Sequence, residues 1–145
     1  MKPYYSKRPV PQIMNVKNIP EHLLAAILPF NWNLKKVWAL PCESQLYPRS
    51  DFDYLLSLAF WSSVQNQGML YDISPLNVLM ESEKAPHQYK RIMDANIEYP
   101  LDILNYQGQL WILDGLHRLA QLYLLDVKTV AVRVHPEHVI PWIKV

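Results

Sequence analysis

The residues with the clearest potential for chemistry lie in one short segment, Asp114–Arg118. An apolar run precedes Asp114, and apolar residues at helical spacing follow Gly115, so a helix is expected to begin here with His117 and Arg118 in its first turn. The unpaired N–H groups and the positive dipole end of a helix start favour an anion, so each cationic side chain there costs about 0.3–1 kcal/mol. A bound phosphate would reverse this cost, because the amides, His117 and Arg118 could all contact one anion. The segment therefore predicts a phosphate site.

The elements on either side of this segment position it. Two short strands are expected at residues 101–104 and 110–113, joined by a hairpin connection over residues 105–108 that contains a glycine. A helix is expected over residues 115–125, and the alternation of valines over residues 128–134 predicts a final half-buried strand. Residues 135–145 are expected to form a tail.

The preceding part of the chain predicts mostly helices. Expected helices cover residues 20–28, Asp51 to Val64, Leu76 to Met80 and Gln88 to Ala95, and one strand is expected from Val37 to Leu40. Ser74 and Pro75 suit the N-cap and the first position of the third helix. This order of elements indicates the α+β class: a small mixed β-sheet with packed helices.

Composition restricts the function classes. The chain has 145 residues, half of them hydrophobic, which fits an extended arm over residues 1–20 and a single domain over residues 21–145. The net charge of +1 gives no global field that would attract nucleic acid or membrane. The single cysteine, Cys42, excludes an internal disulfide and a cysteine zinc site. Since the sequence lacks a signal peptide and a membrane-spanning segment, the expected location is cytoplasmic.

Residues 99–134 resemble the nucleotide-binding half of the ParB/sulfiredoxin superfamily, and they make up about a quarter of the chain. In that superfamily a hairpin strand leads into a Gly-x-His-Arg or Asp-Gly-x-His-Arg turn, the helix that follows binds nucleotide phosphates, and a last strand completes the sheet. The match is closest to the free-serine kinase branch. This resemblance implies a ParB/sulfiredoxin-like fold for the domain.

The resemblance also implies roles for single residues. Gly115 would let the backbone approach phosphate, His117 and Arg118 would contact it, and Asp114 would take part in catalysis. Sulfiredoxins have their catalytic cysteine at the position of Leu116, so sulfiredoxin chemistry is excluded.

The kinase branch further uses a glutamate after its first strand as general base. Glu43 is the candidate for this role, and Asp51 and Asp53 compete with it.

The expected function is therefore nucleotide binding, with phosphoryl transfer from a Mg²⁺-bound nucleotide (ATP, ADP or CTP) to an unidentified small-molecule or protein acceptor. The alternative is a non-catalytic regulatory or partner-binding module of the same fold. DNA binding or nuclease activity is disfavoured, because the charge is near neutral and there is no room for a DNA-reading helix pair.

Simpler explanations exist for the same residues. Asp-Gly is a common hairpin turn, but helical periodicity follows it here, and Asp114 is also suited to capping the helix. His135 and His138 lie near Glu137 and could be read as metal ligands, yet no third ligand converges on them in the sequence, so a solvated turn is expected. His22 and His87 are expected at the surface.

Overall fold

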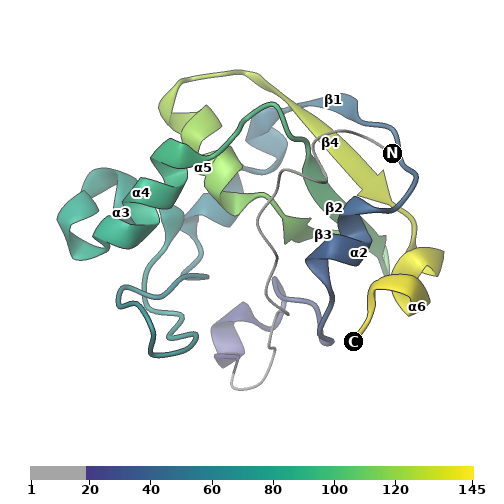
Figure 1. Ribbon diagram of the computed structural model, residues 1–145, viewed down its shortest axis with the longest axis horizontal. Helices are drawn as coiled ribbons and strands as arrows, with labels where there is room; N and C mark the ends of the chain where they lie inside the picture. Colours follow the sequence, from purple (N-terminus) through teal and green to yellow (C-terminus); the bar gives the residue numbers. More distant parts are fainter. Residues whose placement is uncertain (1–18) are drawn as a thin grey trace.

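The computed structural model describes residues 19–145, and the arm expected over residues 1–20 lies almost wholly outside this range. Figure 1 shows α3 and α4 side by side at one end of the molecule and α2 and α6 at the other. The helices are α2 (Leu34–Trp38), α3 (Pro75–Met80), α4 (Pro86–Asp94), α5 (Leu116–Leu124) and α6 (Ile140–Ile143). The 3-10 helices are η1 (Glu21–Leu23), η2 (Arg49–Asp51), η3 (Asp53–Ser57), η4 (Ser82–Lys84) and η5 (Glu137–Val139).

A four-stranded mixed sheet forms the centre of the fold. Its strands are β1 (Gln45–Pro48), β2 (Leu101–Tyr106), β3 (Gln109–Asp114) and β4 (Thr129–His135), in the order β1-β4-β2-β3. The β2–β4 pair is parallel and the other two pairs are antiparallel. The chain is therefore a small α+β fold, as its sequence predicts.

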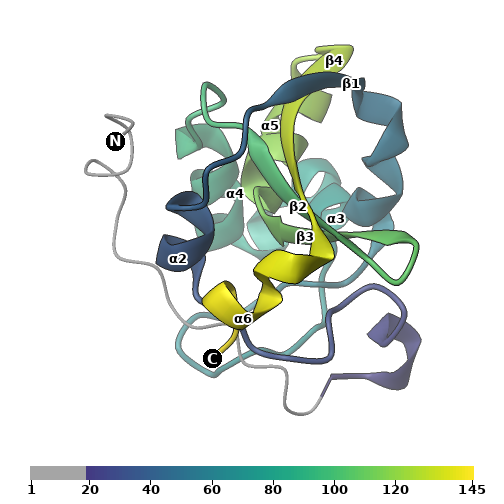
Figure 2. The same cartoon turned by 90° about the vertical axis from the view of Figure 1, so that its right-hand side faces the viewer.

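Apolar side chains cover both faces of this sheet. On one face, Leu101 and Ile103 of β2 pack with Leu119 of α5 in a cluster that also includes buried residues of η3, α3 and α4. On the other face, Leu104 and Trp111 pack in a second cluster with residues of α2 and α6. Figure 2 shows α2 and α6 near each other, and both helices contribute residues to this second cluster. The alternation of side chains along each strand thus supplies two separate cores.

Several predicted elements are confirmed. The hairpin forms from β2 and β3, but β2 continues to Tyr106 and the turn is reduced to Gln107-Gly108, both with positive φ. Ser74 caps α3, with its side chain accepting a hydrogen bond from the backbone N–H of Asn77. Helix α4 begins two residues earlier than expected, whereas α5 and β4 lie within one residue of their predicted bounds.

The strand predicted from Val37 to Leu40 is wrong. Residues 34–38 form helix α2, because the side chain of Asn33 caps the first turn by accepting a hydrogen bond from the backbone N–H of Lys36 at 3.1 Å. The strand in this part of the chain is β1 instead, at the edge of the sheet. Its exposed side chains lack the alternation that predicts a half-buried strand.

The long helix predicted from Asp51 to Val64 is also wrong. Two short 3-10 helices, η2 and η3, replace its first part, and the chain becomes extended at Leu58. Further on, Trp61 pairs with Ile73 in an isolated bridge. The side chain of Ser62 accepts a hydrogen bond from the backbone N–H of Leu70 at 2.7 Å, so it stabilises a loop where the pattern predicted a helix.

Two smaller expectations need correction. Only η1 forms within the helix predicted over residues 20–28. The predicted tail contains the end of β4, η5 and α6, and His135 is completely buried rather than part of a solvated turn.

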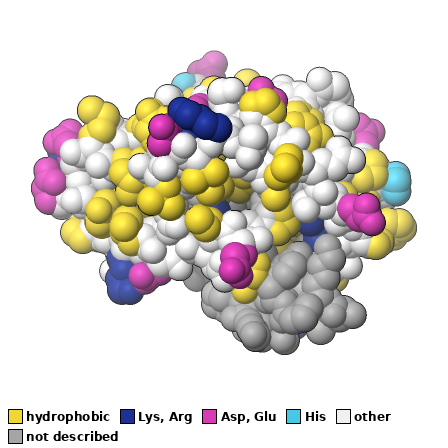
Figure 3. Space-filling view, turned by 90° about the horizontal axis from the view of Figure 1, so that it is seen from above, with side chains coloured by type: hydrophobic (Ala, Val, Ile, Leu, Met, Phe, Trp, Pro, Cys, Tyr) yellow, Lys and Arg dark blue, Asp and Glu magenta, His cyan; other side chains and the backbone are white. Residues whose placement is uncertain are grey.

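The surface is of mixed character. Figure 3 shows hydrophobic side chains spread over the face seen from above, with Lys and Arg side chains separated rather than joined into a continuous positive surface on the part that is described. Among residues 19–145, no helix is both long and apolar enough to cross a membrane.

Candidate functional site

Asp114 takes its position from an irregularity in the hairpin. Asp102 lies opposite Asp114, whereas the next residue of β2, Ile103, lies opposite Ile112, so Leu113 is an extra residue in β3. Such a bulge redirects the side chains that follow it. Here it brings the carboxylate of Asp114 to α2, where the indole Nε1 of Trp38 donates a hydrogen bond to it at 2.8 Å.

Gly115 joins this strand to α5. Its φ of 122° belongs to a region that L-residues rarely adopt, and a Cβ at this position would lie 2.5 Å from the Leu101 side chain. No side chain among residues 19–145 caps the start of α5 at this glycine. The first turn of α5 therefore begins close to the core, with backbone N–H groups that are suited to an anion.

Arg118 holds the turn together from within. Its Nη2 donates to the Asp114 carboxylate and to the carbonyl oxygen of Pro100, each at 3.2 Å, and the residue is buried. Its buried Nε has no hydrogen-bond partner among the described residues. The resemblance implied that Arg118 contacts phosphate, whereas the Nη2 group of this arginine orders the turn.

His117 is half-buried and held by two neighbours. Its ring stacks on Trp61, with 4.1 Å between ring centroids, and its Nε2 lies 2.8 Å from Oε1 of Gln88. Gln88 is in turn fixed by the carbonyl oxygen of Ser62, to which its Nε2 donates at 3.2 Å. His87 also lies on this carbonyl, with its Nε2 at 3.1 Å.

Burial lowers the pKa of His117 well below its ordinary value, and the positive charge of Arg91 lowers it further. Arg118 and His87 act on this pKa in the same direction, whereas the negative charge of Asp114 raises it. The charge of Asp114 also acts on Arg91, raising an arginine pKa that burial lowers. The imidazole is therefore neutral at pH 7, beside several cationic groups and one carboxylate.

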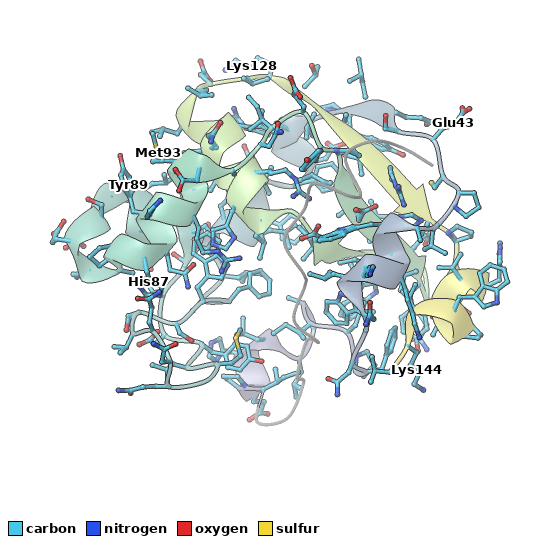
Figure 4. All side chains as sticks on the ribbon, in the orientation of Figure 1. Glu43, His87, Tyr89, Met93, Lys128 and Lys144 are labelled. Carbon is cyan, nitrogen blue, oxygen red and sulfur yellow. The ribbon has the colours of Figure 1, made fainter. Side chains whose placement is uncertain are left out.

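The three carboxylates considered as the base lie elsewhere. Glu43 is exposed and precedes β1, which is separated from β3 by two strands. Figure 4 shows Glu43 and His87 at opposite ends of the molecule. Asp53 pairs with Arg49 at 3.0 Å, and Asp51 is an exposed residue at the end of η2. The structure brings Asp114, Gly115, His117 and Arg118 together, but Glu43 does not join them.

Sequence reasoning missed the residues that surround the turn. Trp38, Trp61, and the α4 pair Gln88 and Arg91 come from three separate parts of the chain, and only the tertiary fold brings them to the turn between β3 and α5. Of these four residues, only Arg91 could have been chosen from the sequence as a candidate site residue. It is a cation on the polar side of an amphipathic helix, where a ligand can reach it.

Two hollows occur in the described part of the chain away from this turn. One of about 410 Å³ is lined by Ser63, Asp72, Ile73, Asn77 and Lys84, and one of about 260 Å³ is lined by Cys42, Glu43 and residues of β1 and β4. Neither includes the start of α5. Within residues 19–145, no group of three or more His, Cys, Asp or Glu side chains is arranged to hold a metal ion.

The chain was compared with protein-family models, curated proteins and solved structures, and none of them matches it.

Proposed function

We propose that the start of α5 binds the phosphates of a nucleotide and that the domain is a phosphotransferase. The observation that carries the proposal is the charge around His117: Arg91, Arg118 and His87 all disfavour a proton on its ring, and within residues 19–145 only Asp114 favours one. A phosphate at this point would offset the mutual repulsion of the cations and would meet the first amides of α5, which no side chain of residues 19–145 caps.

Two further features fit this ligand. Gly115 keeps the turn free of a side chain, so that an anion can approach the backbone closely. The buried guanidinium of Arg118 adds a positive charge beside the turn, which favours an anion there.

In this proposal the phosphates lie against the first turn of α5 and the Arg91 guanidinium. Asp114 is the carboxylate that would hold Mg²⁺, with its orientation set by Trp38 and Arg118. Phosphoryl transfer needs mainly positioning and charge neutralisation, and this set of groups supplies both.

Calorimetric titration with ATP, ADP, CTP and inorganic phosphate in the presence of Mg²⁺ tests the proposal. A nucleotide is expected to bind, and Arg91→Gln is expected to weaken it about tenfold or more, since one charge-assisted hydrogen bond contributes about 1.5–3 kcal/mol. Lys90→Gln is the matched control, because it removes the same charge from the neighbouring position of α4, where Lys90 pairs with Asp94.

Absence of binding by every nucleotide and by phosphate would overturn the proposal, as would equal affinity of the Arg91→Gln and wild-type proteins. Binding without any turnover would instead identify a regulatory module that uses the same site.

A further inference from the structure

The hydrogen bonds around Gln88 determine which nitrogen of His117 carries the proton. The carbonyl oxygen of Ser62 only accepts hydrogen bonds, so the Gln88 amide nitrogen must face it, as the 3.2 Å contact requires. This leaves Oε1 of Gln88 facing Nε2 of His117 at 2.8 Å. Because Oε1 is also only an acceptor, Nε2 must be the donor.

The other ring nitrogen, Nδ1, is therefore a bare acceptor in the neutral ring. Within residues 19–145 it makes no hydrogen bond, and it is not among the buried nitrogens that lack a partner, so it reaches the surface. His117 is the second residue of α5, so this nitrogen lies at the helix start where the phosphates are proposed to bind.

A lone pair at this position does not suit a deprotonated phosphate oxygen, which is itself an acceptor. It suits a hydroxyl group, which donates. We propose that Nδ1 of His117 is the general base for a hydroxyl-bearing acceptor, and this assignment rests on the nucleotide site proposed above.

The proposed step is balanced in atoms and charge. The hydroxyl proton moves to Nδ1 as the hydroxyl oxygen forms a bond to the γ-phosphorus of ATP. The bond from that phosphorus to the β–γ bridging oxygen breaks, and ADP leaves with the electron pair. The imidazolium then releases its proton to solvent, which restores the neutral ring.

Charged groups from three elements face this base. Arg91 and His87 of α4 and Arg118 of α5 oppose a proton on His117, whereas Asp114 of β3 favours it. Together with burial, they keep the base in its unprotonated form over a pH range in which an ordinary histidine is partly charged.

Long-range ¹H–¹⁵N spectra of histidine-labelled protein test the tautomer without any nucleotide. We expect His117 to be neutral at pH 7 with its proton on Nε2, and Gln88→Leu to abolish this preference. A proton on Nδ1, or a charged ring at pH 7, would overturn the assignment. Nucleotide binding by the same sample would then show that the phosphate site stands while the base does not.

Transfer of the γ-phosphoryl group from labelled ATP to glycerol and to water tests catalysis. His117→Gln is expected to lower the rate about 100-fold or more, while its affinity for ATP stays within about twofold of wild type. The wild-type rate should remain constant as the pH is lowered through 6.5, the ordinary pKa of histidine. Equal rates in the two proteins, or no transfer by the wild type, would overturn the role.

Discussion

Two clusters in the fold are built from the same three residue types. Asp102, Arg133 and His135 form one on the α2 side, and all three are at most 2% exposed. Asp114, Arg118 and His117 form the other at the start of α5, where the histidine is half-buried. In the first cluster the histidine contacts the aspartate, with 2.8 Å between its Nε2 and Oδ1 of Asp102. In the second it is held by a glutamine instead.

The difference lies in what each arginine does. Arg133 pairs with Asp102 at 3.0 Å and donates to the carbonyl oxygens of Val37 and Leu40, so it anchors the C-terminal end of α2 to the sheet. Arg118 holds only one turn, and the ring of His117 beside it stays half-buried. Identical residue types therefore serve stability in one place and are suited to ligand binding in the other.

Replacing Arg133 should have the largest effect on stability. Arg133→Met would leave the carboxylate of Asp102 buried without its cationic partner, and breaking a buried ion pair in this way costs about 3–5 kcal/mol. Urea denaturation of variant and wild type measures this loss. Lys128→Ala removes an exposed pair with Asp126 and should leave the stability nearly unchanged. A similar small loss for Arg133→Met would show that the buried cluster does not stabilise the fold.

A glycine pair tests how tightly the α5 turn is packed. Gly115 and Gly108 both have positive φ, but a Cβ would contact Leu101 only at Gly115, and Gly108 has open space around it. Gly115→Ala should therefore be more destabilising than Gly108→Ala by about 1–3 kcal/mol, the cost of overpacking a buried position. Urea denaturation provides both values. Equal losses would mean that the turn adapts and that the glycine is not needed for packing.

The C-terminal half of the fold was predictable because its signals are local. The hairpin, α5 and β4 each show their own periodicity, and Gly108 and Gly115 mark the turns between them. Local signals gave a wrong prediction at residues 37–40. Apolar residues there indicated a strand, but the Asn33 cap starts a helix. Edge strand β1 is too exposed to have an alternating pattern.

The candidate site likewise has a part that the sequence predicts and a part that only the fold reveals. Asp114 to Arg118 are contiguous, so sequence alone could group them. Gln88 and Trp61 meet His117 through contacts across 29 and 56 positions, and no local pattern encodes such contacts. The same holds for the buried cluster, where the burial of His135 depends on β2 lying parallel to β4. The prediction of a solvated turn at His135 is wrong for this reason.

Protonation of His117 should have the smallest effect on stability. Because the pKa of His117 is lowered in the folded state, the unfolded chain binds more protons as the pH falls below about 6.5, its unfolded pKa. The contribution of His117 to stability is therefore fully present above this pH and decreases on acidification, by at most about 1.4 kcal/mol per pH unit, until the folded pKa is reached.

Urea denaturation between pH 7.5 and pH 5 measures this dependence as the difference between wild type and His117→Gln. His138→Gln, which changes an exposed histidine, should keep the wild-type slope. If the unfolding free energy of His117→Gln depends on pH as steeply as that of wild type, the His117 ring is not held neutral. Saturating phosphate should weaken the slope only in proteins that retain His117, because an anion beside the ring offsets the repulsion from Arg91. That result would distinguish the cluster of Asp114, His117 and Arg118 from the buried cluster around Arg133, because phosphate has no access to Arg133.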